Sequence, residues 1–280
     1  MKNKKSEQTK RKPLKELTLL DRFLFDTAMS DPEICRNILS IIFNDRDISN
    51  ICLGVSEKTQ EPYYDSRAVR LDLLAFDEKD VVYDAEAQKE NTGNRHLRRR
   101  SRLYQSHIDV NLLEPGERDF GKLNDVYVIF IAPFDLFGQE KYMYTFRLIC
   151  DEVSGMPLND GAVRIFLNTH GKNDSEVSPE LVEFLHYVER TADYDGEIQN
   201  SRVRKLADQI EMLKSNQEVG VKYMRLWEEL DDARIEGREE ERLSSIRNLM
   251  DSTGWTAERA MEALKISETE RQKYVNMLSK

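Results

Sequence analysis

Cysteine and long apolar segments are both scarce in this 280-residue sequence. The three cysteines, Cys35, Cys52 and Cys150, lie far apart and lack the spacing of a metal site. A sparse, odd set of this kind fits reduced thiols in a cytoplasmic protein. The most apolar run, Val126 to Phe134, is too short to cross a bilayer, and the lysine-rich start lacks the apolar core of a secretory signal. We therefore expect a soluble, cytoplasmic protein without a membrane partner.

Several common catalytic motifs are also missing. The sequence contains no Gly-x-Ser-x-Gly elbow, no Walker phosphate loop and no Cys/His pattern of a zinc site. The formal net charge of −10 argues against non-specific coating of nucleic acid, although it says little about a local cleft. The chain is long enough for a full α/β core with a second, smaller unit.

Residues 67–89 have the pattern of a β-hairpin. Apolar residues alternate along two stretches, with Val69, Leu71, Leu73 and Ala75 in the first and Val81, Tyr83, Ala85 and Ala87 in the second. The polar residues 77–80 between them predict a turn. Because side chains alternate between the two faces of a strand, Asp84, Glu86 and Gln88 share one face.

The hairpin brings two carboxylates together if its loop comprises the three residues 78–80. Phe76 then pairs with Val82, and Asp72 pairs with Glu86. Opposed carboxylates repel each other, and a divalent cation would reverse that repulsion, with magnesium or manganese favoured by the oxygen ligands. The alternatives are a solvated strand face that binds nothing, or a register shifted by one residue, which would remove the opposition.

The remaining elements predict a mixed α/β sheet with helices packed on it. Residues 1–16 form a basic tail that we expect to be disordered, 17–195 form the core, and 196–280 form a helical C-terminal region. Asp31 and Pro32 mark the start of a helix as its N-cap and first residue. The other predicted elements are strands at 51–55, 126–133, 142–149 and 163–168, and helices at 95–113 and 179–188.

The helix predicted at 95–113 begins with five arginines within eight residues. Arg95, Arg99 and Arg102 lie at positions i, i+4 and i+7, so they share a face. This concentration makes them the best candidates for binding nucleic-acid phosphates. Arg100, Tyr104 and His107 form a neighbouring stripe, in which the Tyr104 ring could pack or stack on a base. The alternative is a solvated helix whose arginines pair with acids elsewhere.

The region after residue 195 is acidic and has helical periodicity. Its apolar residues occupy heptad positions that are weakened in the middle, namely Val203, Leu206, Ile210, Leu213, Gln217, Gly220, Met224 and Trp227. Such a stripe needs a partner surface. That surface is the core, another part of the tail or a second copy of the chain. We favour a homodimer through these helices, with a helical hairpin that folds back as the alternative. The last 25 residues predict two short helices, the second starting with a capping box at 267–270.

The spacing of Asp72, thirteen intervening residues and Glu86-Ala87-Gln88 resembles the active-site pattern of the PD-(D/E)xK nuclease superfamily. More specifically, the chain resembles the PD-(D/E)xK nuclease family transposases, which are related to the Rpn recombination-promoting nucleases. The segments 100–106, 128–135 and 165–169 support the resemblance, which spans roughly residues 18–190. Leu71 stands in place of the proline of the superfamily name, and Gln88 in place of its lysine.

The resemblance implies a restriction-endonuclease-like fold and a magnesium-dependent DNA endonuclease linked to DNA mobility or recombination, with manganese as a possible substitute. It implies that Asp72 and Glu86 bind the metal and that Gln88 completes the catalytic set. Asp21 or Asp26 would be an additional acid near the metal, or else a solvated surface residue. A glutamine can orient water but brings no charge, so more of the charge stabilisation falls on metal and arginine. The alternative function is that of a catalytically inactive descendant that binds DNA or protein.

Overall fold

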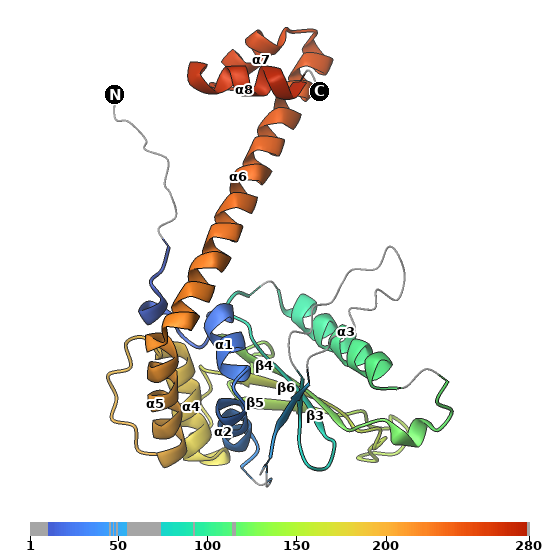
Figure 1. Cartoon of the computed structure of the whole chain (residues 1–280). Helices are drawn as coiled ribbons and strands as arrows, with labels where there is room; N and C mark the ends of the chain where they lie inside the picture. Colours follow the sequence, from blue (N-terminus) through green and yellow to red (C-terminus); the bar gives the residue numbers. More distant parts are fainter. Residues whose placement is uncertain are drawn as a thin grey trace. The chain divides into compact units, whose positions relative to one another are not determined.

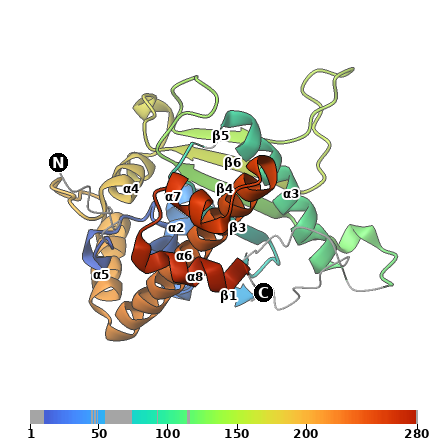
Figure 2. The ribbon, with the colours of Figure 1, turned by 90° about the horizontal axis from the view of Figure 1, so that it is seen from above.

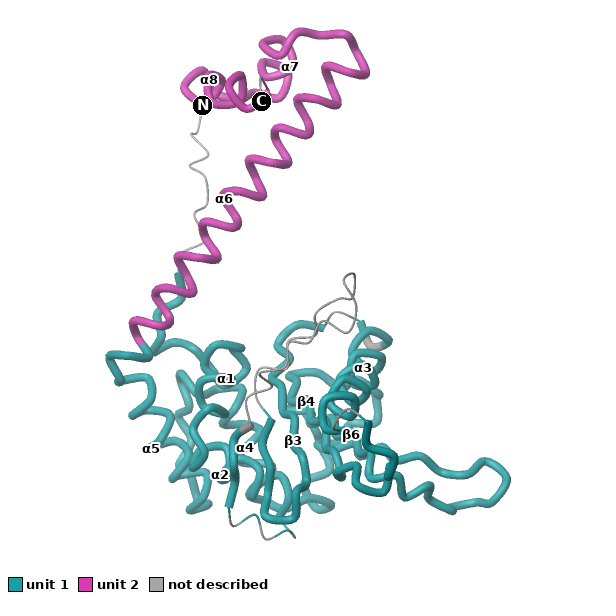
Figure 3. Tube along the Cα trace, turned by 45° about the vertical axis from the view of Figure 1, so that its right-hand side comes forward, with its two compact units in different colours: residues 1–219 teal, residues 220–280 magenta. Residues whose placement is uncertain are grey.

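The computed structural model describes residues 11–44, 46, 48, 50–54, 74–91, 93–113 and 116–278 (Figure 1). The chain divides into two compact units, residues 1–219 and residues 220–280, which Figure 3 shows in different colours. Most of the predicted basic tail lies outside the described residues, apart from a short 3₁₀ turn, η1, at Leu14–Glu16.

A six-stranded mixed sheet forms the centre of the first unit within the described part of the chain. Its order is β1-β2-β3-β4-β6-β5, in which the pairs β3–β4 and β4–β6 are parallel and the other pairs are antiparallel. The bounds are β1 Cys52–Gly54, β2 Leu74–Phe76, β3 Val82–Ala87, β4 Val126–Ala132, β5 Met143–Phe146 and β6 Ala162–Asn168. The mixed sheet with flanking helices confirms the predicted fold class.

Helices cover both faces of this sheet (Figures 1 and 2). Helix α3 (Asn94–Leu112) lies on one face, where Leu97 and Ile108 pack against Val128 and Phe130 of β4. Helices α1 (Arg22–Met29), α2 (Pro32–Ile42) and α4 (Pro179–Arg190) lie on the other face. Because β4 is covered on both sides, all seven of its residues are buried, as the continuous apolar run predicts.

Local signals in the sequence account for several helix boundaries. Asp31 caps α2, because its carboxylate accepts hydrogen bonds from the backbone N–H groups of Glu33 at 2.9 Å and Ile34 at 3.1 Å. Pro32 occupies the first turn, where its missing N–H costs nothing. Ser178 caps α4 in the same way. Two further 3₁₀ turns, η2 (Phe120–Lys122) and η3 (Asp174–Glu176), lie in connections.

The predicted heptad stripe is interrupted at Asn216, where α5 (Ser201–Ser215) ends before α6 (Gln217–Thr253) begins. Three apolar residues of α5 are buried, namely Val203, Leu206 and Ile210, and α5 packs against α2 and α4. The first part of the stripe therefore finds its partner surface in the core. Although the predicted helical region starts at residue 196, its first helix belongs to the first structural unit.

The second unit has a small apolar core of its own. It contains most of α6, together with α7 (Ala257–Ala263) and α8 (Glu268–Leu278), so the two short terminal helices are confirmed. Its buried residues are Ile246, Ala260, Met261, Ile266 and Tyr274. Throughout the described part of the chain, every helix is too short or too polar to span a membrane.

Candidate active site

The β2–β3 hairpin has the predicted register, with Phe76 opposite Val82. The Asp77 carboxylate fixes the turn by accepting hydrogen bonds from the N–H groups of Lys79 at 2.9 Å and Val81 at 3.0 Å. Asp80 takes the left-handed conformation that closes the turn, with φ at 57°. Asp72, the predicted partner of Glu86, lies outside the described residues. The structure therefore confirms the register on which the pairing was predicted, and the pairing itself stays a prediction.

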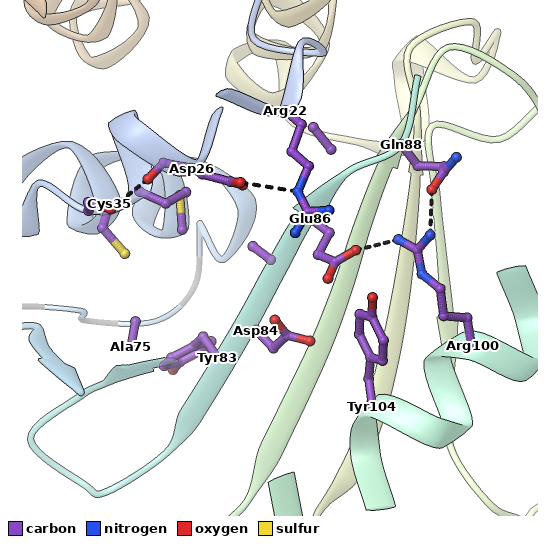
Figure 4. Close-up of a pocket in the computed structure, with 14 residues that line it drawn as sticks. Arg22, Asp26, Cys35, Ala75, Tyr83, Asp84, Glu86, Gln88, Arg100 and Tyr104 are labelled. Atoms are coloured by element: carbon purple, nitrogen blue, oxygen red, sulfur yellow. Dashed lines mark hydrogen bonds and ion pairs between the residues drawn. The ribbon is translucent and has the colours of Figure 1, made fainter. Parts of the chain in front are cut away.

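A cavity of about 150 Å³ lies beside the end of β3, between α1 on one side and α3 on the other (Figure 4). Its lining residues come from α1, α2, β2, β3 and α3, and so from well-separated parts of the sequence. Its charged and polar side chains include Asp84, Glu86 and Gln88 from the β3 segment, Arg22 and Asp26 from α1, and Arg100 and Tyr104 from α3.

Arg100 connects the two predicted catalytic residues that the structure describes. One terminal nitrogen, Nη1, donates a hydrogen bond of 2.8 Å to Oε1 of Gln88, and the other, Nη2, forms an ion pair with Oε2 of Glu86. The guanidinium carbon also lies 5.2 Å from the ring centre of Tyr104 and 5.0 Å from that of Phe130. Since Nε2 of Gln88 donates to the carbonyl of Glu90 at 2.6 Å, both ends of the glutamine amide are fixed.

Burial dominates the electrostatics of Glu86. It raises the pKa of the Glu86 carboxyl above its ordinary value, and the charge of Arg100 and a hydrogen bond from the Tyr104 hydroxyl only partly oppose this rise. Burial, followed by the negative charge of Glu86, raises the pKa of Tyr104 to about 12. The tyrosine therefore remains a neutral hydrogen-bond donor to the carboxylate at physiological pH.

The two other acids of the cavity differ in their surroundings. Asp84 lies on β3 opposite Val128. Its side chain is buried, with only 4% of the residue exposed, although an acid on a strand face is usually solvated. Asp26 forms an ion pair of 3.3 Å with Arg22 and lines the same cavity as Glu86. Asp21 instead accepts a hydrogen bond from the N–H of Thr18 at 2.8 Å.

The predicted phosphate-binding arginines lie on a different side of α3 from the cavity. Arg95, Arg99 and Arg102 are all exposed, and none of them lines the cavity, whereas Tyr104 does. The ring of Tyr104 packs against Phe130 with centroids 6.0 Å apart. Arg100 was missing from the predicted site residues, although its spacing of four from Tyr104 on the same helix face was the signal that could have found it.

The carboxylates of Asp84 and Glu86 line one cavity and are the kind of ligand that a hard divalent cation prefers, whereas the amide oxygen of Gln88 is directed at Arg100. Within the described ranges, however, no three His, Cys, Asp or Glu residues already have the arrangement of a metal site. One predicted ligand, Asp72, is not among those residues, and another, Glu86, is paired with Arg100.

One comparison with known families gives a match. The family model for PD-(D/E)XK nuclease family transposases matches residues 22–236, which is more than half of the chain. The chain belongs to this family. The match extends from α1 into α6, and it implies a restriction-endonuclease-like fold and a function related to nucleases and transposases. Among curated proteins and among solved structures, no significant match was found.

Proposed function

We propose that this protein is a metal-dependent DNA endonuclease that acts in transposition or recombination. The observation that carries the proposal is the convergence of Glu86, Gln88, Arg100 and Asp84 on one cavity at the end of β3. Glu86 and Gln88 are the residues that correspond to the second acid and the lysine of the family's name pattern. The reaction adds water to a phosphodiester and yields a phosphomonoester and an alcohol.

Asp72 and Glu86 are the residues that would hold the metal, with Mg²⁺ as the first candidate and Mn²⁺ as a substitute. The bound ion would lower the pKa of a water molecule and neutralise phosphate oxygens. Tyr104 would keep the Glu86 carboxylate oriented through its hydroxyl. The apolar rings around Arg100 would exclude bulk water and strengthen the electrostatic interactions inside the cavity.

DNA is the proposed partner, and the exposed face of α3 would contact its backbone. Arg95, Arg99 and Arg102 project from the helix that also supplies Arg100 to the cavity. Their guanidinium groups make no hydrogen bond or ion pair with another described side chain. They would therefore bind phosphates without breaking existing contacts, and position a strand relative to the cavity without reading its sequence.

Incubation of the purified protein with supercoiled plasmid tests the proposal. We expect nicking or linearisation in Mg²⁺ or Mn²⁺ and none in EDTA. Asp72→Asn should abolish cleavage while the folded protein keeps its melting temperature in EDTA. Cleavage that continues undiminished in Asp72→Asn would exclude this residue as a metal ligand.

A second candidate function is that of an inactive nuclease-fold protein that binds DNA or protein. It is favoured by the Glu86–Arg100 ion pair, which occupies a predicted metal ligand, and by Gln88, which lacks the positive charge of the lysine in the family's name pattern. Binding of DNA that is equally strong in EDTA and Mg²⁺, without cleavage in either, would support this candidate.

We also propose a cytoplasmic location and a homodimer formed through the C-terminal helices. Four large apolar side chains on α6 are more than 40% exposed, namely Val221, Met224, Leu230 and Ile235. Sedimentation of the full-length chain as a dimer, and of a chain ending at residue 219 as a monomer, would support this assembly. A chain that ends at residue 195 would not be a suitable monomer control, because it lacks α5, which packs against α2 and α4.

A further inference from the structure

The catalytic set at the end of β3 lacks the cation that the family's name pattern contains. Gln88 occupies the lysine position and is neutral. The next residue, Lys89, does not replace it, because its Nζ lies 2.5 Å from Oδ1 of Asp21 and it does not line the cavity. Hydrolysis of a phosphodiester builds up negative charge on the phosphate, and an amide cannot offset that charge as a cation would.

Only two cationic side chains line the cavity among the described residues, Arg22 and Arg100. Arg22 has a side chain that is 70% exposed, and it pairs with Asp26 on its own helix. Arg100 has a side chain that is 23% exposed and contacts Glu86 and Gln88 at the same time. Of the two, Arg100 has the position and the desolvation that a catalytic cation requires.

We propose that Arg100 supplies the positive charge that a lysine at position 88 would supply, and that Gln88 acts as its positioning residue. This inference rests on the proposed nuclease function. The Gln88 amide is itself held by the Glu90 carbonyl, so its Oε1 is directed at Nη1 of Arg100. The cation thus reaches the catalytic position from α3 rather than from β3.

The surroundings of Arg100 leave it able to bind a further anion. A guanidinium has five N–H donors, and the contacts with Glu86 and Gln88 use one on each terminal nitrogen. Its buried Nε has no hydrogen-bond partner among the described residues. The rings of Tyr104 and Phe130 hold its plane. Because Nε is buried, a phosphate oxygen in the cavity would meet the second N–H of each terminal nitrogen on a fixed, largely desolvated cation.

A charge-relocation experiment distinguishes this role from a purely structural ion pair. Arg100→Gln should lower the rate of plasmid cleavage by roughly 100-fold to 1000-fold, the range found when one transition-state donor is lost. The double variant Arg100→Gln with Gln88→Lys moves the charge to β3 and should recover cleavage to within about tenfold of the wild type. Arg98→Gln, two positions earlier on α3 and outside the cavity, is the matched control and should cleave normally.

Manganese affinity, measured by calorimetry without DNA, gives a readout that is independent of cleavage. Removal of the cation beside Glu86 should tighten Mn²⁺ binding by roughly tenfold in Arg100→Gln, because a repulsive charge is lost. The double variant should reverse this gain. A structural role predicts the opposite, namely weaker Mn²⁺ binding together with a lower melting temperature.

Two results would overturn the inference. The first is wild-type cleavage by Arg100→Gln, and the second is a folded double variant that binds Mn²⁺ but does not recover cleavage. If the wild type cleaves no DNA at all, the proposed function fails. The direction of the change in Mn²⁺ affinity then still decides for or against Arg100 as the charge beside the site.

Discussion

The two faces of α3 carry the same kind of side chain in opposite environments. Arg100 faces the cavity and is enclosed by two rings, an acid and an amide. Arg95, Arg99 and Arg102 face solvent and have no partner side chain among the described residues. The two environments differ electrostatically, because burial strengthens a charge while exposure leaves it screened by salt. The proposed division of one arginine-rich helix between chemistry and polyanion binding rests on this difference.

Arg98 belongs to neither face. Its Nη2 donates a hydrogen bond of 2.8 Å to the carbonyl of Leu136, and its guanidinium carbon lies 4.5 Å from the ring centre of Phe137. Arg98 thus attaches α3 to the loop that follows β4. The arginines of this one helix therefore have three different environments, and the role proposed for each can be tested separately.

The largest effect on cleavage should come from a substitution inside the cavity. Glu86→Gln removes the carboxylate that Arg100 contacts, and we expect cleavage to fall by about 1000-fold or more because a metal ligand is lost. The rise in melting temperature that Mn²⁺ causes in the wild type should disappear as well. Glu90→Gln is the control, since its side chain is exposed and only its backbone carbonyl contacts Gln88. Normal cleavage by Glu86→Gln would contradict the site.

Substitutions on the exposed face of α3 should weaken the binding of DNA without changing the rate of hydrolysis. Arg99→Ala combined with Arg102→Ala should weaken DNA binding roughly 30-fold near 0.1 M salt and reduce the salt slope by about two units. The rate of cleavage at saturating DNA should stay close to that of the wild type. Arg147→Ala, an exposed arginine elsewhere in the first unit, is the control. An unchanged salt slope would show that this face of α3 is merely solvated.

A substitution in the loop beside Arg98 should lower the stability of the fold without changing cleavage or DNA binding. The Asp135 carboxylate accepts hydrogen bonds from three backbone N–H groups and from the Tyr144 hydroxyl at 2.7 Å. Burial by itself would raise the pKa of Asp135, but these hydrogen bonds outweigh it and keep that pKa below its ordinary value. Asp135→Asn should therefore lower the free energy of unfolding by about 1.5 kcal/mol at pH 7.

The pH dependence of this loss has a definite sign. A lowered pKa gives stability that is present above the unfolded value of about 4 and is lost as pH falls through the folded value. Urea unfolding measures the difference in free energy of unfolding between the wild type and Asp135→Asn. This difference should shrink as the pH falls from about 5 to about 3, a range that spans the unfolded pKa of about 4. A difference that is constant over this range would show that the charge of Asp135 is not what stabilises the loop.

The smallest effect should come from Arg98 itself. Arg98→Ala loses one hydrogen bond and one cation–π contact at a partly solvated position, so we expect a loss of about 1 kcal/mol in the free energy of unfolding. Cleavage and the salt slope should not change. If Arg98→Ala altered cleavage as strongly as Arg100→Gln, the separation between the faces of α3 would be wrong.

Local patterns were sufficient for much of the fold. Alternation in residues 69–87 predicted the hairpin. The pairing of Phe76 with Val82 depended on an assumed loop of three residues, and the structure has that register. Asp31 and Pro32 predicted the start of α2. The continuous apolar run at 126–132 predicted a strand buried on both faces. The ordered segments also predicted the family, which the comparison confirmed.

The boundary between α5 and α6 could not be predicted from local patterns. Heptad spacing continues across Asn216, so periodicity alone does not separate α5 from α6. What separates them is packing, because Val203, Leu206 and Ile210 of α5 are buried within the first unit. A stripe predicts that a partner surface exists, but not which surface it is.

The sequence by itself determined which residue types stand at the end of β3, a glutamate and a glutamine two positions apart, and that an arginine-rich helix follows. It could not determine which of five similar arginines meets them. That choice depends on the angle at which α3 packs on β4, where Leu97 and Ile108 contact Val128 and Phe130. Because this packing turns Arg100 and Tyr104 toward Glu86 and leaves Arg95, Arg99 and Arg102 in solvent, only the tertiary structure assigned the buried charge.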